Sequence, residues 1–462
     1  MASDSQIFLT RRSVLRQTAS AGAAILPAST PAVTAELHHP ARAQHVIMLY
    51  MSGGYSHVDT FDPKPRLVRQ HDLSIGTELE AAVSSQPRVE RFLKAPLWKY
   101  SQNRYCGTEV SDLFPWIRDQ MHHVALIRSM HCDHRDHGQA TLQLHTGSTG
   151  ATMPGIGAWL SYALPPLHPS LPSHVVISEH RPYSGPVIWD AAFLPGRHSG
   201  VQIVPGDDPL PNLQPAVPIG SQKLELGLLE QLNNLHLRQR KADPALESRI
   251  ASFQLAESLQ ELAPAILDLS GESKETHSLY GSDAADTTSY AAQCLTARRL
   301  IERGVRFVEI IDSVGACRDN WDAAHRDIST HEKYAQRVDR PIAGLLTDLR
   351  SRGLLQDTLV VFCTEFGRSP WAQDGKGTKS RTHHPSAFSC WMAGGGVKSG
   401  IAYGRTDDIG NRVVENAVHI HDLHATILHL LGVDHERLTF HHAGRDFRLT
   451  DVHGRVADGL LA

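Results

Sequence analysis

Acidic and histidine side chains gather directly after four short apolar runs of the sequence. Carboxylates and imidazoles are the groups that bind divalent metals and move protons near neutral pH. The chain has 29 histidines, but only a few stand in this position. The residues in question are His57 and Asp59; His137; Asp322 and His325; and Glu365 with Arg368, followed shortly by His383 and His384.

Several of these residues also allow a structural interpretation. His57 and Asp59 could orient the glycine turn that precedes them, and Asp322 could cap a helix. A buried Glu365 needs a partner, which is either a metal ion or the guanidinium of Arg368. Because the clusters recur at strand ends, they together favour a metal-dependent site over separate capping roles.

The adjacent histidines at 383 and 384 precede Pro385, which favours extended backbone. Consecutive side chains of an extended segment point to opposite sides. We therefore expect only one of His383 and His384 to face the site.

The apolar runs themselves predict buried strands of a parallel sheet. They span residues 45–51, 123–128, 173–177, 305–311 and 358–363. Helical patterns lie between them, at residues 224–235, 245–262, 291–303 and 334–352. This alternation predicts an α/β fold with a mostly parallel central sheet sandwiched by helices. Ligands bind beyond the carboxyl ends of such strands, so the clusters are expected to meet at one edge of the sheet.

Composition narrows the class of protein. Of the 462 residues, 41% are hydrophobic and 20% charged, which is typical of a globular protein and excludes a disordered one. The net charge of -4 lacks the basic excess of a nucleic-acid-binding protein, so no nucleic-acid partner is expected. The six cysteines are scattered, which argues against a disulfide framework. Residues 221–290 predict a helical insertion within one domain that spans residues 44–462.

The N-terminus predicts an export signal. Residues 10–16, TRRSVLR, precede a short, weakly apolar stretch at residues 18–26. Paired arginines in this position resemble a twin-arginine signal, although an ordinary basic arm is the alternative. Cleavage after Ala35 or after Ala43 would fit, and we prefer Ala43 because the first strand begins just beyond it, which makes residues 1–43 the signal peptide.

The signal implies the twin-arginine export machinery as a partner and a periplasmic or extracellular location. The stretch at residues 18–26 is too short to span a bilayer. No later apolar run reaches the length of a membrane span. The mature chain is therefore expected to have no transmembrane segment.

Longer motifs resemble those of the domain-of-unknown-function family 1501 (DUF1501), exported proteins of the alkaline phosphatase and sulfatase superfamily. The resemblance runs from about residue 45 to residue 462. It includes SGGYSHVDTFDPKP (52–65), IRSMHCDHRDHGQA (127–140), RGLLQDTLVVFCTEFGRSP (352–370) and AGGGVKSGIAYGRTDD (393–408). It implies the fold of that superfamily, whose members cleave phosphate or sulfate esters with divalent metals.

The resemblance also implies roles for individual residues. Asp322 and His325 are similar to the Asp and His that hold one metal, and His383 or His384 is similar to its third ligand. Glu365 matches the acid that binds a second metal in that superfamily. The next ligand of that second site is replaced by Phe366.

Two further positions depart from the superfamily pattern. His137 stands where sulfatases have their modified cysteine, so a formylglycine sulfatase is not expected. The first metal-binding Asp of the superfamily falls on Ser52 or Gly53, and His57 and Asp59 could substitute for it.

Two functions from different classes follow. The first is an exported hydrolase of phosphate or sulfate esters, with a small-molecule or polysaccharide substrate and a divalent metal (zinc, calcium or manganese). The second is a non-catalytic binding protein on a degenerate sulfatase-like scaffold. In the hydrolase, Asp322, His325, His383 or His384, Glu365, His57 and Asp59 would form the metal site, and His137, Ser56 and Arg368 would be the catalytic candidates.

Overall fold

A nine-stranded sheet runs through the part of the chain that the computed structural model describes, which comprises residues 37–75, 90–150, 152–240, 243–283, 286–313, 320–372 and 374–462. The strand order is β12-β4-β11-β8-β1-β7-β5-β6, and β15 pairs with the end of β4. Only β11 runs antiparallel to its two neighbours in this sheet. The predicted mostly parallel α/β fold is therefore confirmed.

The central strands follow the predicted apolar runs closely. β1 (His45–Met51) and β8 (Thr358–Cys363) have the predicted bounds, whereas β4 (Val124–His131), β5 (His174–Ser178) and β7 (Phe307–Asp312) differ by one to three residues at their ends. The remaining strands of the sheet are β6 (Val201–Ile203), β11 (Phe388–Ala393), β12 (Ile401–Tyr403) and β15 (Val418–His419). Two-stranded pairs outside it are β2 (Tyr100–Gln102) with β3 (Glu109–Ser111), β9 (Gly367–Arg368) with β10 (His383–His384), β13 (Arg405–Thr406) with β14 (Val413–Glu415), and β16 (Phe440–His442) with β17 (Arg445–Phe447).

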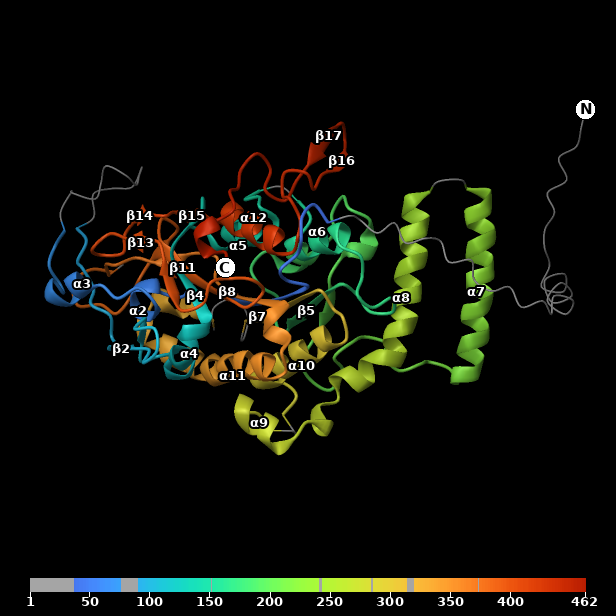
Figure 1. Cartoon of the computed structure of the whole chain (residues 1–462), viewed down its shortest axis with the longest axis horizontal. Helices are drawn as coiled ribbons and strands as arrows, with labels where there is room; N and C mark the ends of the chain where they lie inside the picture. The colour runs from blue at the N-terminus through green and yellow to red at the C-terminus, as the bar shows by residue number, and fades with distance from the viewer. Residues whose placement is uncertain are drawn as a thin grey trace, which may run out of the picture. The chain divides into compact units, whose positions relative to one another are not determined.

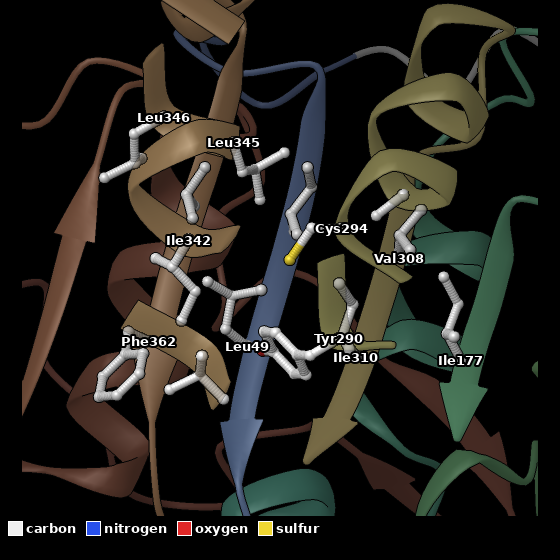
Figure 2. Packing of buried hydrophobic residues seen from close by; sticks show 14 of the residues in the cluster. Leu49, Ile177, Tyr290, Cys294, Val308, Ile310, Ile342, Leu345, Leu346 and Phe362 are labelled. Atoms are coloured by element: carbon white, nitrogen blue, oxygen red, sulfur yellow. The ribbon is translucent and has the colours of Figure 1, made fainter. Parts of the chain in front are cut away.

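Helices cover both faces of the sheet, as the side-chain alternation of β1 shows. Ile47, Leu49 and Met51 pack into one buried cluster, with α4 (Pro115–Gln120), α10 (Tyr290–Glu302) and α11 (His331–Ser351). Val46, Met48 and Tyr50 pack into the other, with α5 (His137–Thr146), α6 (Ile156–Ala163) and α12 (Ile420–Leu430). Figure 2 shows the first cluster, in which Tyr290 and Cys294 of α10 and Leu345 of α11 lie over the central strands.

The predicted helical insertion contains α7 (Ile219–Gln239), α8 (Pro244–Leu267) and the short α9 (Lys274–Tyr280). α7 and α8 lie side by side as a hairpin, with α8 nearer the sheet (Figure 1). The buried face of α8 reaches the core through Ala263 and Ile266, whereas α7 has no buried residue among those described. Two further short helices, α2 (His57–Thr60) and α3 (Pro65–Arg69), follow β1.

The described residues ahead of β1 are part of this fold. His38 and Arg42 donate backbone hydrogen bonds to the carbonyls of Gly432 and Leu430, at 3.0 and 2.8 Å. Ala43 is buried and also donates to Leu430. Cleavage after Ala35 would leave these contacts intact, whereas cleavage after Ala43 would remove them. Residues 1–36 of the predicted signal lie outside the described part of the chain.

The described residues bear on membrane-spanning helices and on cysteine pairing. None of their helices is both long enough and apolar enough to cross a membrane. Their cysteines are unpaired, at Cys106, Cys132, Cys294, Cys363 and Cys390. Cys317 lies outside the described residues.

Candidate metal centre

Four segments that follow parallel strands meet at one edge of the sheet. Gly53 follows β1, His137 follows β4 through a five-residue loop, Asp322 follows β7, and Glu365 follows β8. His137 lies 2.6 Å from Glu365 and 2.9 Å from Asp322, and the Gly53 amide donates to Glu365 at 2.9 Å. The structure thus brings together side chains that are far apart in the sequence, at the edge where ligands of open α/β sheets bind.

His137 is the first residue of α5, and both of its ring nitrogens face carboxylates. Nδ1 lies 2.6 Å from Oε1 of Glu365, and Nε2 lies 2.9 Å from Oδ1 of Asp322. The ring is held between the stacked ring of Tyr183, with centroids 4.2 Å apart, and Phe366, with centroids 4.7 Å apart. These contacts fix the orientation of the imidazole.

Glu365 is fully buried and has several hydrogen-bond donors. Besides His137 and Gly53, the Tyr50 hydroxyl donates to it at 3.1 Å, and the Thr364 hydroxyl oxygen lies 3.0 Å away. Burial raises the pKa of Glu365, but the contact with His137 outweighs burial, so that its pKa lies below the usual value. Glu365 is therefore an ionised acceptor that orients His137.

The next two turns of α5 also make polar contacts with strands of the sheet. Thr141 Oγ1 lies 2.9 Å from the hydroxyl of Tyr50 in β1, and His145 Nε2 lies 2.6 Å from Oε1 of Glu309 in β7. His137, Thr141 and His145 are four residues apart and share one helix face. Glu365 lies just after β8, Tyr50 in β1 and Glu309 in β7, and these three strands are neighbours in the sheet.

His383 reaches the same site from β10. Its Nε2 lies 3.1 Å from Oδ1 of Asp322 and 2.6 Å from Nε2 of His325. Its Nδ1 lies 2.8 Å from the carbonyl oxygen of Arg135. His325 Nε2 is 3.9 Å from the same oxygen of Asp322, at the more exposed side of the cluster.

Asp322 is the common partner of these side chains. It belongs to a short 3₁₀ helix, Trp321–His325, whose cap Asn320 accepts a hydrogen bond from the Asp322 amide at 3.0 Å. The guanidinium of Arg368 donates to Oδ1 of Asp322 at 2.8 Å and to the carbonyl of Gly54 at 2.7 Å. Burial raises the pKa of Asp322, but the neighbouring His137 and His383 rings and the charge of Arg368 hold its pKa far below the usual range.

Hydrogen bonds outside the cluster set the tautomers of two histidines. Nδ1 of His137 donates to the Glu365 carboxylate and Nδ1 of His383 donates to a carbonyl, so in each neutral ring the lone pair is on Nε2. Both Nε2 atoms face Oδ1 of Asp322, which is also an acceptor. His137 Nε2 is buried and makes no hydrogen bond of acceptable geometry.

Such a set of facing acceptors fits a cation. The donor atoms of His137, Asp322 and His383 lie within 4.8 Å of one another, the only such group of three or more found among the described residues. A carboxylate or carbonyl on the second nitrogen is the usual outer support of a metal-binding histidine. Imidazole-rich donor sets suit zinc and other transition metals, whereas calcium takes oxygen ligands. The residues present therefore fit a transition metal better than calcium.

Protonation of a histidine is the other way to relieve the repulsion between the imidazole lone pairs and the Asp322 carboxylate. Burial lowers the pKa of His137, but its close contacts with the carboxylates of Asp322 and Glu365 outweigh burial and raise the pKa above its usual value. Burial lowers the pKa of His383 to about 4, so this ring is neutral near neutral pH. A proton and a metal ion compete for the position between His137 and Asp322.

Gly53 makes the close approach of these segments possible. It has a φ of +110°, and a Cβ at this position would lie 2.5 Å from the amide nitrogen of Asp322. Its amide also donates to Glu365. Any other residue here would push the Asp322 segment away from Glu365.

The structure places four of the predicted site residues in a second cluster, which we call the α2 cluster: Ser56, His57, Asp59 and His384. Asp59 and Arg381 form a fully buried ion pair with an Nε–Oδ2 distance of 2.7 Å, and the Ser56 hydroxyl donates to Asp59 at 2.5 Å. Ser56 is therefore a partner of Asp59, without contact to Asp322. Arg381 also donates to the Ser369 carbonyl at 2.9 Å, so the α2 cluster anchors the strand pair β9–β10.

The two histidines of the α2 cluster bond outward to the backbone. Nε2 of His57 lies 2.8 Å from the Gly410 carbonyl, and Nε2 of His384 lies 2.5 Å from the Asn411 carbonyl. Their rings stack with centroids 6.3 Å apart. His383 and His384 thus point to opposite sides of β10, and it is His383 that contacts Asp322.

Tyr183 is a member of the site that sequence reasoning missed. It stacks on His137, and its hydroxyl lies 3.4 Å from Oδ2 of Asp322. The loop that supplies it follows β5, the one predicted strand whose end contributed no residue to the predicted site. Glu179 and His180, directly after that strand, were the available signal.

The C-terminal histidines have local roles at α12. His419 is the N-cap of this helix, where its ring accepts from the His421 amide while Asp422 accepts from the His419 amide. His424 is buried, and its Nε2 lies 2.7 Å from the Leu144 carbonyl. These contacts give His419 and His424 structural roles at the start and on the buried face of α12.

A family model described as "Protein of unknown function (DUF1501)" matches residues 43–461. The search of curated proteins finds no match.

Three solved structures match the chain at low identity and with TM-scores below 0.5. A sulfatase from Pseudoalteromonas sp. has 13% identity and a TM-score of 0.37, over 91% of this chain and 72% of that chain. A lipoteichoic acid synthase from Listeria monocytogenes has 7% identity and a TM-score of 0.38, over 86% and 74%. An alkaline phosphatase from the Antarctic bacterium TAB5 has 10% identity and a TM-score of 0.33, over 78% and 94%.

Proposed function

Because the chain belongs to the DUF1501 family, whose description names no activity, we propose from the chemistry of the site that it is an exported metal-dependent hydrolase of phosphate or sulfate esters. The observation that carries this proposal is the pair of Nε2 atoms, on His137 and His383, that face Asp322 with their tautomers fixed from outside. The export part of the proposal rests on the twin-arginine motif at residues 10–16.

His137, His383 and Asp322 would hold the metal, with His325 beside them. A bound divalent ion would polarise an ester oxygen and make a bound water more acidic. Asp322 and Glu365 carry two negative charges against the one positive charge of Arg368. A divalent cation would turn this negative cluster into a positive one, which favours an anionic ester as the substrate.

The chain's own groups divide into supporting and substrate-facing ones. Arg368 is fully buried and bonded to Asp322 and two carbonyls, so we assign it the role of positioning Asp322. The His325 side chain is 28% exposed, and Tyr183 is half-buried. We therefore assign contact with the substrate, and proton transfer at its leaving-group oxygen, to His325 and Tyr183.

Water is the proposed nucleophile. The Ser56 hydroxyl is fully buried and bonded to Asp59, away from Asp322. The Thr364 hydroxyl donates to the Met51 carbonyl at 2.8 Å and lies beside Glu365. With both ring nitrogens directed at carboxylates, His137 is better suited to hold a metal than to attack a substrate.

Phe366 supports the second candidate function, a metal- or anion-binding protein without turnover. Its fully buried ring packs against His137 and His383, with centroids 4.7 and 4.6 Å apart. A phenyl ring offers no ligand for a second metal. Binding of phosphate or sulfate without ester cleavage would support this alternative.

The test combines metal analysis with ester hydrolysis. Protein purified without a metal-binding tag is analysed for bound metals and assayed with chromogenic phosphate and sulfate esters, with and without a chelator. We expect one transition-metal ion per chain and chelator-sensitive hydrolysis. A folded protein that neither contains nor takes up metal would contradict the proposal, and metal-loaded protein without turnover would favour the binding protein.

The adjacent histidines provide a matched control. His383→Gln should lose the metal and the activity, whereas His384→Gln, one residue away on the other side of β10, should retain both. Equal loss in the two folded variants would contradict the placement of the metal at Asp322.

A further inference from the structure

α7 is a long helix whose apolar side chains face solvent. None of its 21 residues is buried. Leu224 is 78% exposed, Leu232 50% and Leu235 52%, and Leu228 is also exposed. Most helical stability in proteins comes from packing of an apolar face rather than from helix propensity. α7 also contains Gly220 and Gly227, which weaken a helix further.

The apolar residues of α7 form two separate faces. One face turns toward α8, where the side chain of Gln222 donates to Gln260 at 2.6 Å and the half-buried Leu226 lines a groove with Leu255 and Leu259. The other face, which we call the outer stripe, consists of Leu224, Leu228, Leu232 and Leu235. Their spacing of four, four and three residues places them on one side of a helix. α8 therefore covers one face of α7 and leaves the outer stripe open.

The outer stripe is nearly symmetric along the helix. Leu228 and Leu232 lie at equal distances on either side of residue 230, and Leu224 and Leu235 lie six and five residues from it. A two-fold interface must use the same patch on both partners. In an antiparallel pair of α7 helices, Leu228 of each copy would meet Leu232 of the other, and Leu224 would meet Leu235.

The charges of α7 favour a copy of itself over a charged partner. Lys223 and Arg238 balance Glu225 and Glu230. Helices that bind anionic membranes are instead rich in basic residues on their polar face. A helix without net charge is not repelled by a second copy.

The exposed apolar area of the outer stripe supplies most of what a pair needs. Its four leucines present on the order of 400 Å² of surface per copy, so that a pair would bury about 800 Å² through them alone, and the polar side chains that flank the stripe would have to bring the total to the roughly 1,000 Å² of a specific interface. We propose that α7 is the dimerisation helix of this protein, and that two copies pair antiparallel through their outer stripes into a four-helix arrangement with both α8 helices. This proposal does not depend on the metal site.

The test is the mass of the protein in solution. Light scattering after gel filtration, and sedimentation at several concentrations, should show a dimer with a micromolar or tighter dissociation constant. Leu228→Glu places two carboxylates near the two-fold axis against Leu232 and should weaken dimerisation about tenfold or more. Asn234→Glu adds the same charge to an exposed position outside the stripe and should leave the dimer intact.

Three outcomes would overturn the proposal. They are a wild-type protein that stays monomeric at high micromolar concentration, a Leu228→Glu variant that dimerises like wild type, and an Asn234→Glu variant that dissociates as strongly as Leu228→Glu. Circular dichroism and the melting temperature of each variant establish that the fold is retained. A monomer that sediments with phosphatidylcholine vesicles would instead assign the stripe to a membrane surface.

Discussion

Two clusters of the molecule contain the same kinds of residue: the group around Asp322 (His137, His325, His383 and Glu365), which we call the Asp322 cluster, and the α2 cluster. They lie on opposite sides of β10, and their histidines make hydrogen bonds through opposite ring nitrogens. At Asp322, His137 and His383 use Nδ1 for outside partners and turn Nε2 toward a shared carboxylate. In the α2 cluster, His57 and His384 use Nε2 for backbone carbonyls. The first arrangement leaves the lone pair of His137 facing an acceptor, and that of His383 facing both Asp322 and the ring nitrogen of His325. The second arrangement engages the Nε2 atoms with backbone carbonyls.

The two carboxylates differ in the same way. Asp59 is fully buried and paired with Arg381, a complete ion pair that needs no further cation. Asp322 shares one oxygen among Arg368, His137 and His383. Residue type alone therefore does not separate the proposed metal ligands from the histidines of the α2 cluster. The two groups differ in the partner of the second ring nitrogen.

The largest expected effect is that of Asp322→Asn. This substitution removes the shared ligand, so metal affinity should fall by more than about 100-fold, because even residues that only orient a ligand contribute 10- to 100-fold. Metal titration monitored by competition with a chelator measures the loss. A variant that binds metal like wild type would remove the distinction between the two clusters.

The next effect is on stability rather than on metal binding. Asp59→Ala leaves the buried guanidinium of Arg381 without its partner, and it should destabilise the protein by about 3–5 kcal/mol. The metal content of the folded fraction should not change. Urea unfolding combined with metal analysis distinguishes this result from a loss of metal at unchanged stability, which would place Asp59 in the metal site.

An intermediate effect is expected for Glu365→Gln. The neutral amide would orient His137 less strongly and would leave its Nε2 a weaker ligand, so metal affinity should fall about 10- to 100-fold with the same stoichiometry at saturation. Competition with a chelator again measures the change. An unchanged affinity would show that the contact between Glu365 and His137 serves packing alone.

The smallest effect concerns the acid side of the stability profile. Burial, together with the neighbouring His384, holds the pKa of His57 well below its ordinary value of 6.5. The unfolded chain binds this proton near pH 6.5 and the folded chain does not, so the stabilisation is complete above that pH and is lost as the pH falls below it. The slope from this one group is at most about 1.4 kcal/mol per pH unit. His57→Gln should flatten the decline in melting temperature below pH 6.5, and an unchanged profile would contradict this assignment.

The sequence predicted the central strands because both faces of them are buried and their apolar runs are unbroken. β11 was not among the predicted strands, although residues 388–393 form a similar apolar run. This strand is antiparallel to its neighbours, so its carboxyl end lies away from the edge where the polar clusters gather. The short strands β6, β12 and β15 have two or three residues each and give no periodic signal.

For the site, strand ends indicated the correct segments but not the direction of each side chain. Alternation showed that His383 and His384 face opposite sides, and only the pairing of β10 with β9 determines which of them meets Asp322. His57 and Asp59 follow a strand just as His137 does, but the Asp59–Arg381 pair depends on a partner more than 300 residues away. Tertiary contacts of this kind leave no local pattern.

The contacts of α5 with three neighbouring strands have a consequence for the order in which the protein opens. One helical turn rises 5.4 Å and neighbouring strands are about 4.8 Å apart, so a helix that crosses a sheet can bond to each strand in succession. His137, Thr141 and His145 do so toward β8, β1 and β7. These strands cannot separate, and α5 cannot lift away, without breaking buried polar contacts. The candidate metal centre is therefore attached to a single cooperative unit, whose amide hydrogens should be among the last to exchange with solvent.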